Sequence, residues 1–166
     1  PALDACGKTL ATTIVDEPMK LKGGQDLVNA DGGHLGSITI RKAITVSNNV
    51  VAVKLSDEIT QKLGKEYCEK FGISTLVDNE EINGQIFSDL TQTMALGGLT
   101  HGVYNYEMCA AYAAIANGGV YNTPTLYTKI LDHDGNVLLE GSGETREVIK
   151  DSTAALLTSA MQDVVN

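Results

Sequence analysis

The chain has 166 residues and a mass of 17.6 kDa, which suits one domain of ordinary size. It is 43% hydrophobic but only 5% aromatic, without Trp, so its core must be built from small and aliphatic side chains. The formal net charge of -9 repels phosphate backbones, and no basic run offsets it, which excludes nucleic acid as a partner. The longest uncharged apolar stretch, residues 108–116, is too short to cross a bilayer.

The first part of the chain is predicted to change from loop to helix near residue 39. Residues 1–36 contain many glycines and few periodic apolar runs, which indicates loops with short extended pieces, such as residues 10–15. Thr39 can cap a helix that runs to Val46. Ser47-Asn48-Asn49 should end that helix, because Ser and Asn side chains compete for backbone hydrogen bonds.

Two further helices are predicted in the next segment. Val50, Val53 and Leu55 fit the apolar face of the first, although β-branched residues lower its propensity. The second spans about residues 61–71 and ends at Gly72, the usual place for a C-cap glycine.

The second half of the chain is predicted to hold two more helices and one hairpin. Residues 73–103 are expected to be irregular, whereas residues 105–117 form a helix with small residues on every side, which places it in the core. Two extended segments flank Asp134-Gly135, a pair that favours a tight reversal and therefore a β-hairpin. The last helix begins at Asp151 or Ser152 and carries one apolar stripe: Leu156, Leu157, Ala160, Met161, Val164 and Val165. The predicted class is α+β, predominantly helical.

Neither a metal nor a cofactor is expected. The chain contains three cysteines, Cys6, Cys68 and Cys109, and three histidines, His34, His101 and His133. No cysteine pair has a Cys-x-x-Cys spacing and no histidine lies near them in sequence, whereas a metal site needs three or four ligands. Buried, inert thiols are the simpler interpretation.

The residues that could carry chemistry are few. The sequence contains no Ser-x-x-Lys, Lys-Thr/Ser-Gly, His-Glu-x-x-His or Gly-x-Ser-x-Gly, so no complete catalytic set can be assembled. What remains is the triplet Ser47-Asn48-Asn49 between two helices, where the side chains of Ser47 and Asn49 can point to the same side. A hydroxyl can relay a proton and a side-chain amide can hold a peptide carbonyl. A plain helix-to-helix cap is the alternative.

Several runs of residues carry a resemblance to a known family. They are Asn-Ala-Asp-Gly at 29–32, Gly-Ser-Ile-Thr-Ile-Arg-Lys-Ala-Ile at 36–44, Ser-Asn-Asn-Val-Val-Ala-Val-Lys-Leu at 47–55, Lys-Phe-Gly-Ile at 70–73, Ala-Leu-Gly-Gly at 95–98 and Ala-Tyr-Ala-Ala-Ile-Ala-Asn-Gly-Gly at 111–119. In order and spacing they resemble the transpeptidase domain of class A penicillin-binding proteins. Val51 departs from that pattern, where the family usually has Pro, and so does Tyr104-Asn105, where it has Thr-Pro.

The resemblance implies a fold and a domain that is not complete. It implies the helical part of the penicillin-binding/β-lactamase-like transpeptidase fold with one β-hairpin, most of the central sheet being absent. Residues 1–166 would be a partial transpeptidase domain, an internal fragment without the upstream Ser-x-x-Lys helix or the downstream Lys-Thr/Ser-Gly strand. The start at Pro1, and the end at Asn166 inside a predicted helix, agree with that expectation.

The resemblance also implies an activity, partners and a location. The family's serine attacks D-Ala-D-Ala stem peptides of peptidoglycan, forms an acyl-enzyme and is acylated by β-lactams. Ser47 would then belong to the proton-relay network, and Asn49 would donate a hydrogen bond to the bound acyl-amide carbonyl. The parent protein would face the cell wall from a membrane anchor, on the extracytoplasmic side, and this piece alone would be inactive. A class B penicillin-binding protein and a non-catalytic muropeptide-binding scaffold of the same fold are the alternatives.

Overall fold

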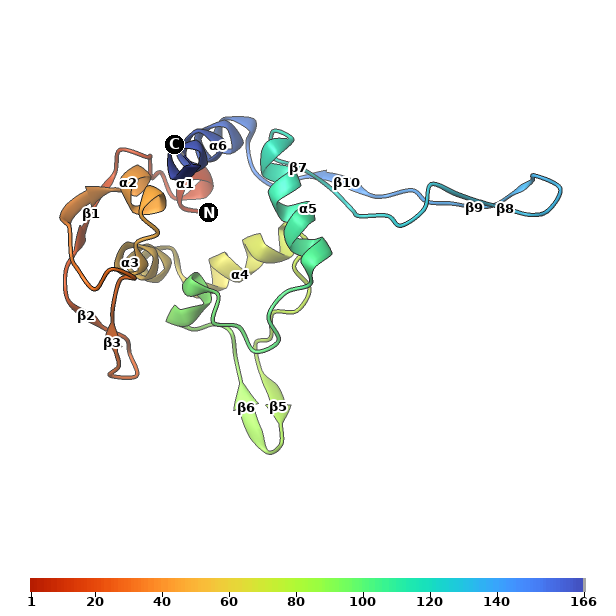
Figure 1. Ribbon diagram of the computed structural model, residues 1–166. Coiled ribbons are helices and arrows are strands. Elements are labelled where there is room, and N and C mark those ends of the chain that lie inside the picture. The colour runs from red at the N-terminus through yellow and green to blue at the C-terminus, as the bar shows by residue number, and fades with distance from the viewer. Residues whose placement is uncertain (166) are drawn as a thin grey trace.

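The computed structural model describes residues 1–165, and helices make up most of its regular structure (Figure 1). The helices are α1 (Ala2–Ala5), α2 (Ile40–Thr45), α3 (Asn49–Ile59), α4 (Gln61–Lys70), the 3₁₀ helix η1 (Gln92–Leu96), α5 (Asn105–Ala116) and α6 (Asp151–Val165). The strands form antiparallel pairs: β1 (Thr13–Asp16) with β4 (Gly36–Thr39), β2 (Met19–Lys20) with β3 (Asp26–Leu27), β5 (Glu80–Ile82) with β6 (Gln85–Phe87), β7 (Val120–Asn122) with β10 (Thr145–Glu147), and β8 (Lys129–Leu131) with β9 (Val137–Glu140).

The five α-helices that the hydrophobic pattern predicted, α2 to α6, are all present. The short helix α1 was not predicted. Thr39 caps α2 as predicted, since its Oγ1 accepts a hydrogen bond from the Lys42 backbone N–H at 3.1 Å. Gly72 follows α4 with φ of 85° and donates its N–H to the Glu69 carbonyl at 2.9 Å, which satisfies a carbonyl of the last turn. No helix within residues 1–165 has both the length and the apolar character that crossing a membrane requires.

The α+β class is confirmed, but the chain pairs more strands than the sequence indicated. One hairpin was predicted, and it is β8–β9; residues 73–103 were expected to be irregular, yet they contain the hairpin β5–β6. Its turn is Asn83-Gly84, with φ values of 52° and 80°. Positive φ at both central residues is what a type I′ hairpin turn requires, and Asn-Gly provides it readily. Each sheet has two strands, and residues 1–165 form no larger one.

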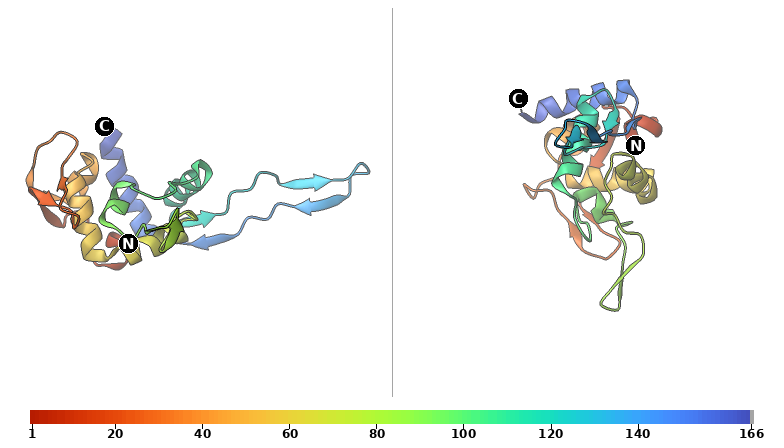
Figure 2. Two further views of the ribbon diagram at one scale, coloured as in Figure 1. Left: turned by 90° about the horizontal axis from the view of Figure 1, so that it is seen from below. Right: turned by 90° about the vertical axis from the view of Figure 1, so that its right-hand side faces the viewer.

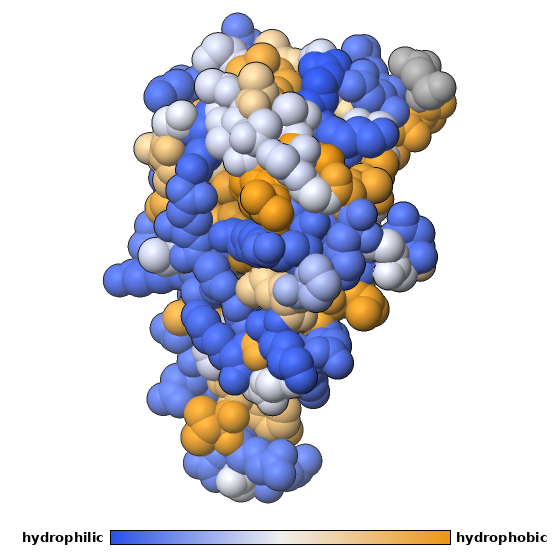
Figure 3. Space-filling view, turned by 90° about the vertical axis from the view of Figure 1, so that its left-hand side faces the viewer, coloured by the Kyte–Doolittle hydropathy of each residue, from blue (hydrophilic) through white to orange (hydrophobic). Residues whose placement is uncertain are grey.

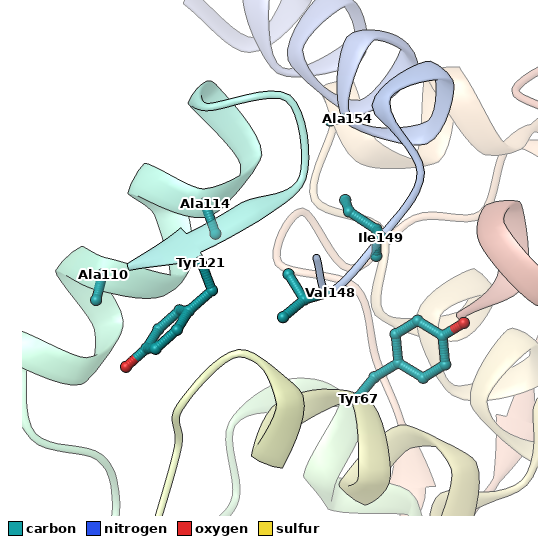
Figure 4. Close-up of a cluster of buried hydrophobic side chains, with 7 residues drawn as sticks. All are labelled: Tyr67, Ala110, Ala114, Tyr121, Val148, Ile149 and Ala154. Atoms are coloured by element: carbon teal, nitrogen blue, oxygen red, sulfur yellow. The ribbon is translucent and has the colours of Figure 1, made fainter. Parts of the chain in front are cut away.

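The main core lies where α4, α5 and α6 meet. Val148 and Ile149, in the segment that leads to α6, lie between the three helices (Figure 4). The buried members of this cluster are Tyr67, Ala110, Ala114, Tyr121, Val148, Ile149 and Ala154. Most of them are small or aliphatic, as the composition predicted.

Two smaller clusters hold α2 and α3, the helices on either side of the Ser47 turn. In one, Leu10 and Ile40 pack with Ala160, which joins the N-terminal segment and α2 to α6. In the other, Leu27 packs against Val50 and Val53, which are fully buried and lie on α3. Both helices are therefore fixed by apolar contacts to segments far away in the sequence.

Helix α5 is less enclosed than its composition suggested. It was expected to be surrounded on every side, but one face is buried, through Glu107, Ala110 and Ala114, while Tyr106 and Tyr112 are each 57% exposed. The reason is that its main helical and strand neighbours among the described residues, α6 and β7, cover one side.

The apolar stripe predicted for α6 is only partly covered, since Ala160 is buried and Val164 is exposed.

The segment around β8 and β9 extends away from the helices as a long two-stranded arm (Figure 2). Its base is the pair β7–β10, and Tyr121 of β7 is the residue that anchors it in the core. Every residue of β8 and β9 is exposed, so the arm contributes almost nothing to the core.

Candidate functional site

A tight turn joins α2 to α3 and contains Ser47. The Ser47 N–H donates to the Ile44 carbonyl at 3.1 Å, and the Asn48 N–H donates to the Ala43 carbonyl at 2.9 Å. Ser47 has φ of 51°, in the left-handed region, which costs a non-glycine residue about 1 kcal/mol. Its side chain is exposed. The turn therefore presents the Ser47 hydroxyl at the surface in a backbone conformation that the neighbouring structure must stabilise.

Asn48 is the buried residue of the turn and the N-cap of α3. Its Oδ1 accepts the Val51 N–H at 2.9 Å, and its Nδ2 donates to Oδ2 of Asp16 at 2.8 Å. Both ends of the carboxamide are used, so the side chain fixes the start of α3 and ties it to the end of β1.

Asn49 is the first residue of α3, not part of a non-helical segment as predicted. The argument that alternating side chains place Ser47 and Asn49 on the same side therefore does not apply. Instead, the Nδ2 of Asn49 donates to the Val28 carbonyl at 2.9 Å, and its backbone N–H donates to Oδ1 of Asn29 at 3.0 Å. The structure thus brings both residues to the turn, with Ser47 exposed and Asn49 partly buried.

Asp16 is the centre of the hydrogen bonds around the turn. Its side chain is inaccessible to solvent and accepts from Nδ2 of Asn29 at 3.0 and 3.1 Å and from the Leu35 N–H at 2.8 Å. Nδ1 of His34 lies 3.0 Å from its Oδ1, and Nδ2 of Asn48 completes the set. A buried carboxylate is tolerated when it is hydrogen-bonded in this way.

The pKa of Asp16 reflects this environment. Burial raises it, but the hydrogen bonds from His34, Leu35, Asn29 and Asn48 outweigh burial and lower the pKa to about 2. The side chain is therefore an ionised carboxylate at neutral pH.

Sequence reasoning missed three residues of this arrangement: Asp16, Asn29 and Asn48. Asn29 and Asn48 lie in runs that resemble the known family, so a signal for these two residues was present. Asp16 and Asn48 are 32 positions apart, however, and no local pattern indicates that their side chains meet.

The turn by itself forms an open site. The Ser47 hydroxyl has no hydrogen bond to the rest of residues 1–165, so it is available to another group.

The turn does not line either of the two surface cavities of about 390 and 560 Å³, which are formed by other residues. Seen from the side where β1 lies, the surface is largely hydrophilic, with apolar side chains in separate patches (Figure 3). The arrangement offers a hydroxyl and a carboxamide, which are groups that relay protons and hold a carbonyl.

The part of the chain described here brings no three His, Cys, Asp or Glu side chains together as a metal would need. Cys109 is exposed, contrary to the expectation of buried thiols, while Cys6 and Cys68 are partly buried.

Comparisons with known proteins give consistent results. The family model for the penicillin binding protein transpeptidase domain matches residues 2–166. Penicillin-binding protein 1A from Clostridium novyi (strain NT) is 38% identical over 137 residues, or 82% of this chain and 15% of that protein. Penicillin-binding protein 1A from Clostridium acetobutylicum is 33% identical over 175 residues, or 100% of this chain and 20% of that protein. The chain therefore spans about a fifth or less of the length of these relatives.

The fold has matches among solved structures. Penicillin-binding protein A from M. tuberculosis, in its imipenem acyl-enzyme complex, superposes with a TM-score of 0.78 at 20% sequence identity, covering 96% of this chain and 40% of that one. At this identity the superposition supports the fold. With the family model matching nearly every residue, the chain belongs to the penicillin-binding protein transpeptidase family.

Proposed function

We propose that this chain is part of a peptidoglycan D,D-transpeptidase, a serine acyltransferase that cross-links stem peptides ending in D-Ala-D-Ala and is acylated by β-lactams. The observation that carries the proposal is the family match over residues 2–166, which includes the turn with Ser47 and Asn49. The imipenem acyl-enzyme of a protein with the same fold supports β-lactams as ligands. The relatives named penicillin-binding protein 1A favour a class A parent.

Ser47 and Asn49 have separate roles in this proposal. The Ser47 hydroxyl relays a proton between the lysine base and the leaving-group nitrogen, a role supported by its exposure and free hydrogen-bonding capacity. The Asn49 carboxamide donates to the carbonyl of the bound acyl-amide. A carboxamide has two N–H donors, and the contact with the Val28 carbonyl uses one, which leaves the other for substrate.

The remaining parts of the active site lie outside this chain in the proposal. The serine and lysine of the Ser-x-x-Lys helix precede Pro1, and the Lys-Thr/Ser-Gly strand follows Asn166. The parent protein acts at the extracytoplasmic face of the bacterial membrane, held by an anchor elsewhere in the polypeptide. Residues 1–166 alone are inactive, because a covalent mechanism requires its nucleophile.

Two other parents are possible on specific grounds. A class B penicillin-binding protein carries a similar Ser-x-Asn motif, and the domain upstream of the transpeptidase distinguishes it from class A. A non-catalytic scaffold that binds muropeptides is the third alternative, and it applies if no Ser-x-x-Lys precedes Pro1. The sequence of the parent before Pro1 separates the three.

Acylation by a fluorescent penicillin tests the proposed function. The full-length protein is expected to be labelled stoichiometrically, and residues 1–166 alone to remain unlabelled. In the full-length protein, Asn49→Ala should slow acylation about tenfold or more, the effect of losing one well-placed hydrogen bond. Asn136→Ala is the matched control, because the Asn136 side chain bonds to Asp132 within its own hairpin turn.

Each result has a distinct meaning. An unlabelled full-length protein would favour the scaffold, and a labelled 166-residue chain would refute its predicted inactivity. If Asn49→Ala is acylated as fast as Asn136→Ala, Asn49 is a helix-start residue without a role in substrate binding.

A further inference from the structure

We propose that Asp16 and Asn29 are positioning residues for the transpeptidase reaction, because their side chains hold the turn that carries Ser47 and Asn49 in place. The inference rests on the proposed function. It concerns residues that lie outside the Ser-x-Asn triplet, on the end of β1 and in the loop after β3.

The first link runs from Asp16 to the turn through Asn48. The Asp16 carboxylate accepts from Nδ2 of Asn48 at 2.8 Å, and Asn48 is the residue between Ser47 and Asn49. Since Oδ1 of the same carboxamide caps α3, rotation of the Asn48 side chain would break both contacts. Asp16 therefore fixes the backbone at the point where Ser47 has positive φ.

The second link runs from Asp16 through Asn29. Asp16 accepts from Nδ2 of Asn29, which leaves the Asn29 Oδ1 directed at α3, where it accepts the N–H of Asn49 at 3.0 Å and of Val50 at 3.3 Å. The Nδ2 of Asn29 also donates to the Gly33 carbonyl at 2.9 Å. The orientation of the Asn29 amide is thus set by acceptors on one side and donors on the other.

The segment that contains Asn29 also sets the Asn49 side chain. The Nδ2 of Asn49 donates to the Val28 carbonyl, and Val28 directly precedes Asn29. The same short segment therefore holds the backbone and the carboxamide of Asn49. Displacement of this segment would rotate the amide that is proposed to meet the substrate carbonyl, and catalysis is sensitive to such small displacements.

Ionisation of Asp16 is what lets it organise the turn. An ionised carboxylate accepts hydrogen bonds and donates none, and all four residues that face it supply N–H donors. The other charged groups near this strand end, Lys54 and Glu17, bond to each other, and Lys54 also donates to the Val15 carbonyl. Replacement by Asn would place an amide N–H against donors, with little change of volume.

Asp89 offers a matched control elsewhere in the molecule. It is 1% exposed, as Asp16 is, and it accepts from the Val77 N–H, the Thr100 N–H and the Thr100 hydroxyl. Asp89→Asn therefore removes a buried carboxylate with similar loss of hydrogen bonds, at a loop that makes no contact with Ser47 or Asn49 through these bonds.

The test measures β-lactam acylation in the full-length protein, separating the first-order acylation constant from the dissociation constant of the non-covalent complex. Asp16→Asn is expected to lower the acylation constant about tenfold, with the dissociation constant changed less than threefold. Asp89→Asn should leave both constants unchanged, although it should lower the melting temperature by about as much as Asp16→Asn does. The double variant Asp16→Asn/Asn48→Asp restores the contact between these two positions but leaves the Leu35 N–H facing an amide N–H, so it should recover only part of the lost rate.

The outcomes separate this inference from the proposed function. If the unmodified protein is not acylated, the proposed function fails and this inference fails with it. If it is acylated and Asp16→Asn reacts normally, or loses no more than Asp89→Asn, only the inference is overturned. Should Asp16→Asn not fold, Asn48→Ser replaces it, because Ser retains the α3 cap but cannot reach Asp16; normal acylation of that variant would likewise overturn the inference.

Discussion

Two single residues, the buried carboxylates Asp16 and Asp89, help to determine the conformation of the loops around them. Asp16 and Asp89 are each 1% exposed, and hydrogen-bond donors surround both. A buried charge without partners would cost several kcal/mol. Within residues 1–165 every buried side-chain nitrogen and oxygen has a hydrogen-bond partner. The two aspartates therefore help to specify the turn at Ser47 and the loop before α5 through hydrogen bonds.

Acid is expected to destabilise the fold through Asp16. Its pKa falls from an ordinary 3.8 to about 2 in the folded chain. A carboxyl whose pKa is lower in the folded state stabilises the fold fully above its unfolded pKa and loses that contribution as the pH falls through the folded pKa. The free energy of urea unfolding should therefore decrease as the pH falls from about 4 towards 2, and Asp16→Asn should make this decrease shallower. An equally steep decrease in both proteins would contradict the assignment.

The ends of helices decide how the elements join. Helix α5 ends at Ala116, and the chain turns into β7 through Gly118 and Gly119, which have φ values of 63° and 88°. A Cβ on Gly119 would lie 2.1 Å from the backbone carbonyl oxygen of Ile149, a residue of the main core. The close approach of two backbones explains why glycine is needed there.

Gly119→Ala is expected to be among the more destabilising substitutions in the chain. The left-handed φ costs a side chain about 1–2 kcal/mol, and displacing the Ile149 backbone adds about 1–3 kcal/mol. Gly102→Ala is the control, since Gly102 has φ of 69° but open space where its Cβ would lie. Chemical unfolding should give a total loss of about 3 kcal/mol for Gly119→Ala and only the φ cost for Gly102→Ala. Equal losses would show that the contact with Ile149 is unimportant.

The whole molecule exposes more surface than a protein of its size normally does. Its accessible surface is 9955 Å², whereas a compact monomer of 17.6 kDa exposes about 7,900 Å². The excess comes with apolar side chains on the β8–β9 arm and on α5. On the arm and around α5, the most exposed apolar side chains are Leu126, Leu131, Leu138, Tyr104, Tyr106 and Tyr112. Apolar surface of this extent promotes association.

Self-association of the purified 166-residue chain is the expected consequence. Its sedimentation coefficient should rise with concentration in the micromolar range. The variant Leu131→Lys/Leu138→Lys should shift this rise to higher concentration, because both leucines are more than half exposed on the arm. Thr128→Lys/Ser142→Lys adds the same charge at exposed polar positions of the same arm and serves as the control. A concentration-independent monomer would contradict the prediction.

Much of the local structure could be predicted from the sequence. The Thr39 cap, the stop at Gly72 and the Asp134-Gly135 reversal were all confirmed, because each depends on a few neighbouring residues. The hairpin at Asn83-Gly84 was missed although its turn pair was recognisable, since its strands are three residues each and have no clear alternation. The position of α5 was misjudged because an apolar helix does not reveal how many neighbours it has.

The amino-acid sequence alone determined the family, the order of the helices and the reversal at Ser47-Asn48-Asn49, because these depend on residue types at close and regular spacing. Only the tertiary structure decided what holds that reversal. Asp16 lies 13 residues from Asn29 and 32 from Asn48, and their side chains meet because β1 and the start of α3 pack together. Contacts between distant segments depend on how the chain packs in three dimensions, which no local pattern encodes.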